Sequence, residues 1–326
     1  MRAVVVEQLG GADALDIREL PEPLPGPGQV TIRVAYAGVN YAEVIARTFG
    51  SRSGQLPFVP GLEASGTIEA IGADVRGFSA GQRVTAFTSV GGYAEVLLAP
   101  SQLTFAIPDS MDLRTAAALP TVLPTADGLI NNAARLRAGE SILVHSAAGG
   151  VGTVAAQLAR IAGARPIIGV TSTVAKAEFA KQFGYDEVLL TGDFDEQCRT
   201  RSAKGIDVVL DSVGGDTWRK SLECVARFGR VVSFGNASDA QPWKAELSML
   251  AGRSIGVYGF SIGTLARTSP RDYRPLAQRA VAMVSAGKVT IPITKEYDLD
   301  QVREAHRHLE SRQSMGKLVL RVAPDA

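Results

Sequence analysis

The residues with the clearest chemical potential are the small ones of Ala147–Gly152, AAGGVG. They follow the apolar run Ile142–Val144, which is typical of a buried parallel strand, and lead into a helix-like run beginning near Val151. The spacing matches the dinucleotide-binding fingerprint, with alanine at the first glycine position. Gly149 would let backbone N–H groups approach a pyrophosphate, and Gly152 would let the helix pack against its strand. Because a helix N-terminus also attracts phosphates, the stretch predicts a nucleotide site.

The type of nucleotide depends on the residues about 20 positions further on, where NAD-binding sites place a carboxylate on the ribose 2′-hydroxyl. This chain has Ser172, Thr173 and Lys176 there instead. Hydroxyls and an ammonium accept a 2′-phosphate, whereas a carboxylate would repel it, so the stretch favours NADPH. The alternative is that Ser172 only caps the next helix and Lys176 is a solvated surface lysine.

A second glycine turn ends the strand-like run Val231–Asn236, VVSFGN. Open parallel sheets bind ligands at the carboxyl ends of their strands, so Asn236 and the backbone of Phe234 could reach the nicotinamide half of the cofactor. An ordinary strand-ending turn explains the same residues equally well. For Asp211–Gly215, which follows the preceding strand, an ordinary turn is the better explanation.

The elements that position these turns alternate between strand and helix, which predicts a parallel, doubly wound sheet. The expected strands are 141–146, 166–171, 187–190, 206–211, 230–234 and 254–259. The expected helices are 125–134, 151–162, 174–183 and 217–226.

The earlier part of the chain has short strands separated by glycine and proline, which predicts a small β-rich domain. The expected strands are 3–6, 30–36, 66–71, 83–87 and 94–98. The expected helices are 38–47 and 111–119, with a joint at 120–124. Beyond Pro270 we expect a helix at 273–286, an extended stretch at 288–296, a helix capped near Asp298, and a last strand at 316–322 that returns to the first domain.

Composition limits the class of protein. The chain has 326 residues, of which 46% are hydrophobic, enough for two domain cores. The formal net charge of +1 gives no reason to expect a nucleic-acid or anionic-membrane partner. Two cysteines, Cys198 and Cys224, form no disulfide framework or metal spacing. The start of the chain does not match a signal peptide, and no run of 18 apolar residues is present, so we expect a cytoplasmic globular protein.

Together these residues resemble the zinc-free quinone oxidoreductase branch of the medium-chain dehydrogenase/reductase superfamily, which includes zeta-crystallin and the enoyl reductase modules of polyketide synthases. The matching segments follow the family's order across the chain: Gly38–Asn40, Arg47, Val59–Val84, Gly91–Val96, Val144–Gly152 and Gly316–Leu320. The resemblance implies an α/β protein with a GroES-like catalytic domain (1–122 and 266–326) and a Rossmann NADP(H)-binding domain (123–265). It also implies a cofactor cleft between the domains and a homodimer formed through the Rossmann domains.

The same resemblance assigns roles to individual residues. Asn40 matches an asparagine near the nicotinamide, and Thr125 matches a threonine that contacts the carboxamide. The other matching cofactor positions are Ala148, Gly149, Gly150, Val151, Ser172, Lys176, Phe234, Asn236, Phe260 and Lys317. Asp127, Thr191 and Ile45 stand where relatives have tyrosine, which weakens a specific quinone assignment.

The resemblance also bears on zinc. Zinc-dependent relatives have cysteine where Asn40 stands and Gly-His-Glu where Gly61–Glu63 stands, whereas this chain has Leu62 at the histidine position. Its three histidines fall elsewhere, and His145 is expected to pack inside a strand. We therefore expect no metal and no alcohol dehydrogenation by a Lewis acid.

The function expected from these features is hydride transfer from NADPH to a quinone or to a C=C bond conjugated to a carbonyl. Asn40 is the candidate donor or cofactor orienter, and Tyr41 is the candidate proton donor, with simple packing as its alternative. Glu43 and Arg47 are spaced for a helix-face ion pair. The loop Thr48–Phe58 and two further stretches are expected to border the substrate: Pro242–Trp243 and Phe260–Leu265.

Two alternatives remain open from the sequence. The nearer one is an enoyl-thioester reductase of a biosynthetic pathway. The other class is a non-catalytic NADPH-binding or RNA-binding crystallin-like protein, and the near-neutral charge argues against the RNA-binding form.

Overall fold

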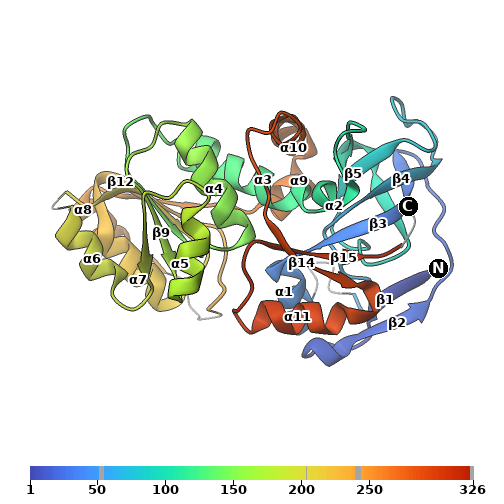
Figure 1. Ribbon diagram of the computed structural model, residues 1–326, viewed down its shortest axis with the longest axis horizontal. Helices are drawn as coiled ribbons and strands as arrows, with labels where there is room; N and C mark the ends of the chain where they lie inside the picture. The colour runs from blue at the N-terminus through green and yellow to red at the C-terminus, as the bar shows by residue number, and fades with distance from the viewer. Residues whose placement is uncertain (51–54, 203, 239–243, 324–326) are drawn as a thin grey trace. The chain divides into compact units, whose positions relative to one another are not determined.

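The computed structural model describes residues 1–50, 55–202, 204–238 and 244–323. Its contacts divide the chain into two units: Met1–Pro124 with Gly263–Ala326, and Thr125–Ile262. The first unit is therefore built from both ends of the chain and the second from its middle, as the colours of Figure 1 show. We describe each unit by itself.

The second unit contains a six-stranded parallel sheet in the order β10-β9-β8-β11-β12-β13. Its strands are β8 (Ile142–His145), β9 (Ile167–Thr171), β10 (Glu187–Leu190), β11 (Ile206–Asp211), β12 (Val225–Ser233) and β13 (Gly256–Gly259). Its helices are α4 (Gly150–Ile161), α5 (Val174–Lys181), α6 (Phe194–Arg201), α7 (Gly215–Cys224) and α8 (Leu247–Arg253). The strand order reverses between β8 and β11, the position at which open α/β sheets bind ligands.

The first unit contains a seven-stranded sheet whose main order is β14-β15-β3-β4-β5-β7, with β6 paired to β3, and a separate β1–β2 ribbon. Its strands are β1 (Arg2–Val6), β2 (Leu15–Glu19), β3 (Gln29–Val39), β4 (Glu63–Ile71), β5 (Arg83–Phe87), β6 (Val96–Pro100), β7 (Thr104–Ala106), β14 (Ile293–Asp298) and β15 (Lys317–Arg321). Its helices include α1 (Tyr41–Phe49), α2 (Leu113–Ala117), α9 (Ile262–Thr268), α10 (Pro270–Ser285) and α11 (Val302–Glu310). The last strand, β15, is antiparallel to β3, so it returns to the first unit as expected.

Several elements differ from the sequence-based expectations. Gly38 and Val39 end strand β3 and are not helical, because Asn40 forms a capping box with Glu43 and the helix begins after it. The expected joint at 120–124 lies inside helix α3 (Leu119–Asp127), which continues as a π-helical turn, Gly128–Ala133. Strands β2 and β7 and helices α6, α8 and α9 were not anticipated. Helix α6, FDEQCRTR, lacks the apolar period by which a helix is recognised.

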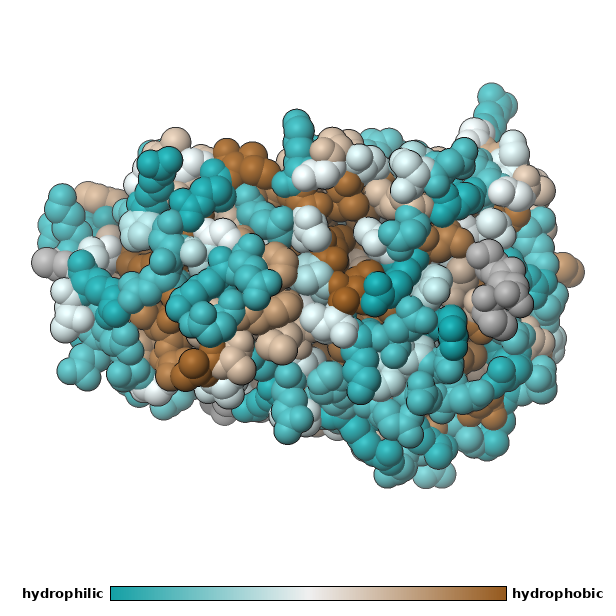
Figure 2. Space-filling view, in the orientation of Figure 1, coloured by the Kyte–Doolittle hydropathy of each residue, from teal (hydrophilic) through white to brown (hydrophobic). Residues whose placement is uncertain are grey.

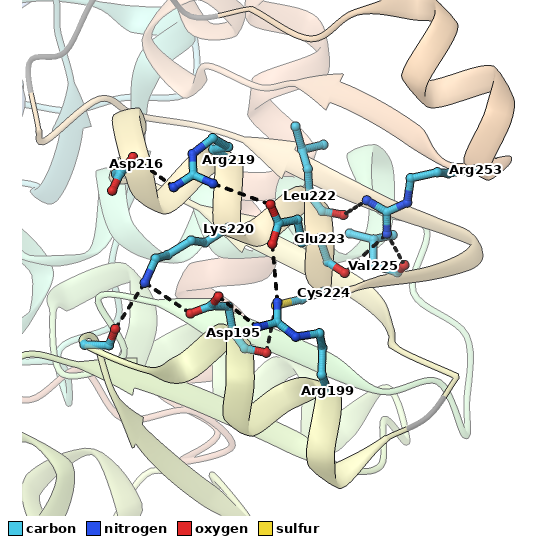
Figure 3. A network of polar contacts seen from close by, with 11 residues as sticks. Asp195, Arg199, Asp216, Arg219, Lys220, Leu222, Glu223, Cys224, Val225 and Arg253 are labelled. Carbon is cyan, nitrogen blue, oxygen red and sulfur yellow. Dashed lines mark hydrogen bonds and ion pairs between the residues drawn. The ribbon is translucent and has the colours of Figure 1, made fainter.

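Helix α8 is tied to the end of α7 by a single arginine (Figure 3). The Arg253 guanidinium donates to the carbonyl oxygens of Leu222, Glu223 and Val225 at 2.7, 3.2 and 3.2 Å. Carbonyls at a helix C-terminus lack intrahelical donors, so a cation placed there satisfies them and complements the helix dipole.

Helices α6 and α7 are joined by ion pairs drawn in the same view. Asp195 of α6 lies 3.1 Å from Lys220 of α7, and Arg199 of α6 lies 3.3 Å from Glu223 of α7. The Arg199–Glu223 pair is exposed, and such pairs contribute on the order of 0–1 kcal/mol, whereas Asp195 and Lys220 are both partly buried.

The face drawn in Figure 2 is mostly hydrophilic, with smaller hydrophobic patches among the polar residues. None of the helices in the described part of the chain combines the length and apolar character needed to cross a bilayer.

Candidate functional site

The turn between β8 and α4, where the sequence predicts a nucleotide site, is tightly packed. Ser146 has a φ of 54°, in the left-handed region, and Gly149 is the N-cap of α4. A Cβ on Gly152 would lie 2.4 Å from the carbonyl oxygen of Ser146 and 2.7 Å from that of Ala147. Only glycine therefore lets the first turn of α4 pack this closely on the loop. The predicted positions Ala148–Val151 form the loop end and the first residues of this helix.

The two strands at the switch point are linked through their following turns. The Ser212 hydroxyl, after β11, donates to the Ser146 hydroxyl, after β8, at 3.1 Å. Asp211 closes its own turn by accepting from the N–H groups of Val213 and Gly214 at 2.6 and 3.0 Å. Asp211 thus closes the turn Asp211–Gly215 with its own side chain, as in the ordinary turn favoured from sequence, although Ser212 also links the turn to Ser146.

The residues expected at the 2′-phosphate follow β9, the strand next to β8. Ser172 is exposed, and Lys176 is half-buried on the first turn of α5, where burial lowers the pKa of its ammonium. The idea that Ser172 caps α5 is wrong: Thr173 is the N-cap, and its hydroxyl accepts from the N–H of Lys176 at 3.3 Å. The Ser172 hydroxyl is therefore not committed to capping.

Three of the residues expected near the nicotinamide follow strands β12 and β13: Phe234, Asn236 and Phe260. The N–H of Phe234, after β12, donates to the carbonyl of Asp211, and the N–H of Phe260, after β13, donates to that of Ser233. The Phe260 ring packs on Gly128, where an added Cβ would lie 2.3 Å from the ring Cζ. Asn236 follows Phe234 and accepts a hydrogen bond from Ser238 at 3.2 Å. Thr125 is buried on α3.

The first unit contains a buried charged cluster at the ends of three adjacent strands. There β3 ends, and its antiparallel neighbours β4 and β15 begin. This pairing brings Asn40, directly after β3, close to Glu63 and Lys317, the first residues of β4 and β15. Glu63 and Lys317 are 0% and 3% exposed. Their side chains form an ion pair with 2.6 Å between Nζ and Oε1.

Every polar atom of this ion pair has a partner within the unit. The Lys317 ammonium also donates to the Val39 carbonyl at 2.9 Å and to the Asn40 side-chain oxygen. The other oxygen of Glu63 accepts from the N–H of Thr121 at 2.7 Å. A buried ion pair needs such added hydrogen bonds to offset its desolvation.

Glu43 is the second buried carboxylate of the cluster. Its oxygens accept from the N–H groups of Asn40 and Leu62 at 2.8 and 3.0 Å, and from the Asn40 side-chain amide at 3.2 Å. Burial raises its pKa to about 7, although Lys317 and the hydrogen bonds from Asn40 and Leu62 oppose this shift. Glu43 therefore titrates near neutral pH.

The other residues expected in this region have different surroundings. Tyr41 is half-buried at the start of α1. The expected pair of Glu43 with Arg47 is wrong, because the fully buried Arg47 side chain instead pairs with Glu310 of α11. Residues 51–54 of the loop 48–58, together with Pro242 and Trp243, lie outside the described residues.

The three histidines are held by protein side chains. His145 is buried in β8, as expected; its Nε2 lies 2.8 Å from the Ser221 hydroxyl, and burial lowers its pKa to about 4. His306 contacts the Tyr93 hydroxyl, and His308 contacts that of Tyr297. In the part of the chain that the structure describes, no group of three or more His, Cys, Asp or Glu side chains is arranged to hold a metal ion.

Sequence reasoning missed Glu43 and Glu63 as members of the polar cluster. The available signal was Gly38: a Cβ there would lie 2.2 Å from an oxygen of Glu63, although Gly38 has ordinary strand backbone. A glycine inside a strand indicates a close approach by another group. Sequence alone did not identify that group.

Comparisons with known proteins show which families two parts of the chain match. Residues 26–109 match the family described as "Alcohol dehydrogenase GroES-like domain", and residues 150–282 match "Zinc-binding dehydrogenase". The chain is 34% identical to the quinone oxidoreductase of Pseudomonas aeruginosa, with 95% of this chain and 96% of that protein covered. It is 32% identical to a 2-haloacrylate reductase of a Burkholderia species, with 98% of each covered. It is also 32% identical to the mouse synaptic vesicle membrane protein VAT-1 homolog-like, covering 99% and 81%.

Two solved structures are similar to this chain over nearly its whole length. The mycobacterial Rv1454c complexed with NADPH superposes with a TM-score of 0.93 at 32% identity, covering 99% of this chain and 100% of that one. The Escherichia coli quinone oxidoreductase complexed with NADPH has a TM-score of 0.91 at 28% identity, with the same coverage. The GroES-like and Rossmann folds expected from sequence are confirmed.

Proposed function

The chain belongs to the quinone oxidoreductase-like branch of the medium-chain dehydrogenase/reductase superfamily, and we propose that it is a zinc-independent, NADPH-dependent reductase of quinones or α,β-unsaturated carbonyls. The observation that carries the proposal is the glycine turn after β8, together with Ser172 and Lys176, which stand after β9 in place of a carboxylate. Two similar solved structures are NADPH complexes, which supports the choice of cofactor.

The residues at the turn fit a phosphorylated dinucleotide. The close packing of Gly152 on Ser146 brings the N-terminus of α4 against the loop, and N–H groups at a helix N-terminus bind pyrophosphate. Lys176 would pair with the 2′-phosphate, helped by the hydroxyl of Ser172. When bound, NADPH supplies the hydride. The protein would orient the cofactor and stabilise the negative charge that develops on the acceptor oxygen.

We retain Asn40 and Tyr41 as the proposed catalytic residues. The residues of the cofactor site proposed from the family resemblance also remain: Asn40, Thr125, Ala148, Gly149, Gly150, Val151, Ser172, Lys176, Phe234, Asn236, Phe260 and Lys317. We propose a GroES-like catalytic role for the first unit and NADP(H) binding for the second.

The proposal is tested by following NADPH and NADH oxidation by purified protein with benzoquinones and with simple enones. Replacing Lys176 by alanine removes a charge-assisted contact worth about 1.5–3 kcal/mol, so KM for NADPH should rise roughly 10- to 100-fold while KM for NADH stays unchanged. Lys181→Ala, on the exposed face of the same helix, is the matched control. Absence of oxidation with every acceptor would refute the reductase assignment.

A second candidate is reduction of the C=C bond of an enoyl thioester. The similarity to a 2-haloacrylate reductase favours a C=C acceptor, since the substrate in that name is an acrylate. Comparing kcat/KM for crotonyl thioesters with that for benzoquinones decides between the two. A non-catalytic NADPH-binding protein would show cofactor fluorescence changes without turnover of either substrate.

We further propose a cytoplasmic homodimer formed through the Rossmann unit. Strand β13 lies at the edge of its sheet, and its residue Tyr258 is 43% exposed, so the edge offers backbone groups and an aromatic side chain for pairing; Leu247, at the start of α8, is 81% exposed. The two cysteines are free thiols, which suits a reducing compartment. Light scattering of the purified protein measures its mass, and a monomer of 34.3 kDa would contradict the dimer.

A further inference from the structure

The hydrogen bonds around Lys317 leave its ammonium with no spare donor. An ammonium has three N–H donors, and three acceptors from the chain surround this one: the Val39 carbonyl, the Asn40 side-chain oxygen and a Glu63 carboxylate oxygen. The side chain is 3% exposed. Lys317 is therefore built to hold neighbouring groups rather than to reach a ligand directly.

The same contacts fix which way the Asn40 amide faces. Lysine can only donate hydrogen bonds, and the Glu63 carboxylate that pairs with it can only accept them, so the Asn40 oxygen must face Lys317 and its nitrogen must face Glu63. The amide nitrogen lies 3.0 Å from Glu63 and 3.2 Å from Glu43. Both N–H donors and the oxygen are thus engaged with the first unit.

The backbone is shaped to admit this cluster. Gly38 leaves room for the Glu63 carboxylate, which a Cβ would approach to 2.2 Å. Gly316 has a φ of 56°, and a Cβ there would lie 2.3 Å from the Pro292 carbonyl oxygen. This glycine turn allows the N–H of Lys317 to donate to the same carbonyl at 2.8 Å. Two glycines beside one buried ion pair indicate a built arrangement and not an incidental contact.

We infer that Lys317 is an internal counter-cation that, with Glu63 and Glu43, locks the side-chain amide of Asn40 in one orientation. Lys317 is then a positioning residue that acts on the reaction through Asn40. This inference rests on the proposed function, which makes Asn40 a catalytic residue. It replaces the direct cofactor contact expected for Lys317. Because both N–H donors are engaged, Asn40 keeps the proposed role of cofactor orienter and does not turn to donate to a substrate oxygen.

The first test uses two variants assayed at saturating NADPH. Lys317→Met removes the ammonium but leaves the Glu63 carboxylate buried without its counter-ion. The double variant Lys317→Met/Glu63→Gln removes both charges with little change in volume, so it stays folded even where the single variant does not. Lys288→Met, at an exposed lysine of the same unit, is the control.

We expect a folded double variant with kcat about 100-fold below wild type and KM for NADPH within about twofold, since loss of orientation at a catalytic group costs this much. A merely structural ion pair gives another result: a double variant with wild-type kcat, which would overturn the inference. The pH profile is a second readout. Lys317 lowers the pKa of Glu43, so its removal should move any Glu43-dependent inflection in kcat to higher pH.

The second test needs no catalytic activity. In ¹⁵N-labelled wild-type protein, the Asn40 side-chain N–H signals, assigned by their loss in Asn40→Asp, should exchange with solvent at least about 100-fold more slowly than those of the exposed Asn132. Equal exchange rates would overturn the inference. If the amide is protected but the wild type oxidises no NADPH, the proposed function fails and the locked amide stands. If the wild type turns over but the amide exchanges freely, the proposed function stands and the locked amide fails.

Discussion

The turn after β8 and the cluster around Lys317 are built in contrasting ways. The turn is contiguous in sequence, uses mostly backbone groups, and depends on Gly152 packing within 2.4 Å of Ser146. The cluster draws side chains from β4, β15 and the start of α1, and its two main charges are 254 residues apart, from Glu63 to Lys317. A site made of backbone can be recognised from a short motif, whereas a site made of distant side chains can be recognised only after the sheet is known.

The contrast also concerns energy. The backbone N–H groups at a helix N-terminus are present whatever the side chains are. A substitution at the turn therefore changes the shape of the backbone around these groups and does not remove them. In the cluster, two carboxyl groups and an ammonium are buried away from water. Removal of one partner leaves the remaining charge buried without compensation. The following experiments test this difference, beginning with the largest expected effect.

Glu63→Gln should lower the free energy of unfolding by about 3–5 kcal/mol, because the Lys317 ammonium then stays buried without a counter-charge. Urea unfolding followed by circular dichroism measures the change. Adding Lys317→Met to this variant should recover a large part of the loss, since the ammonium left without Glu63 is then removed as well. If the two single effects simply add, the side chains are not coupled and the cluster is not a unit.

Glu43→Gln should flatten the pH dependence of stability. The folded-state pKa of Glu43 is raised to about 7 from 4.5, so the folded state binds this proton more tightly than the unfolded state. Stability contributed by the protonated carboxyl is full below pH 4.5 and is lost as pH rises towards 7, by at most on the order of 3 kcal/mol.

The measurement is urea unfolding of wild type and Glu43→Gln at several values between pH 5 and pH 8. Glu304→Gln, at an exposed carboxylate on α11 of the same unit, is the control and should keep the wild-type slope. Parallel curves for wild type and Glu43→Gln would show that Glu43 does not titrate in this range.

Gly38→Ala and Gly152→Ala are matched substitutions in the two regions, since each glycine has ordinary φ and faces an oxygen within 2.4 Å of an added Cβ. Each should cost about 1–3 kcal/mol of stability through overpacking. Only Gly152→Ala should raise the NADPH dissociation constant, measured by fluorescence titration, and only Gly38→Ala should reduce kcat by moving Glu63. Gly252→Ala on α8, where a Cβ meets nothing within 4 Å, is the control.

Ser212→Ala should have the smallest effect. It removes the hydrogen bond to the Ser146 hydroxyl, worth about 0.5–1.5 kcal/mol, at a partly exposed position. A small rise in the NADPH dissociation constant is expected, together with a loss of unfolding free energy no larger than that hydrogen bond contributes. An effect larger than that of Gly152→Ala would mean that side chains, and not backbone packing, dominate the turn.

The sequence predicted the Rossmann unit well because its strands are continuous apolar runs between glycine turns. Strands 187–190 and 206–211 match β10 and β11 residue for residue. It predicted less where polarity hides a helix, as in α6, or where a capping residue moves a boundary, as Asn40 does for α1. Asn40 and Lys317 were singled out through family resemblance, but their mutual contact was not, because it requires β15 to pair with β3.

The position of β15 has a consequence for how the protein is made. This strand pairs with both β3 and β14, yet in the chain it follows the whole second unit. During synthesis, Thr125–Ile262 emerges complete and can fold as a unit while β3 still lacks its partner strand β15. Glu63 likewise has no Lys317 ammonium to pair with until more than 250 later residues have been synthesised. The sheet of the first unit can therefore be completed only after the second unit has been synthesised. Completion becomes possible when β15, which begins at Lys317, is available.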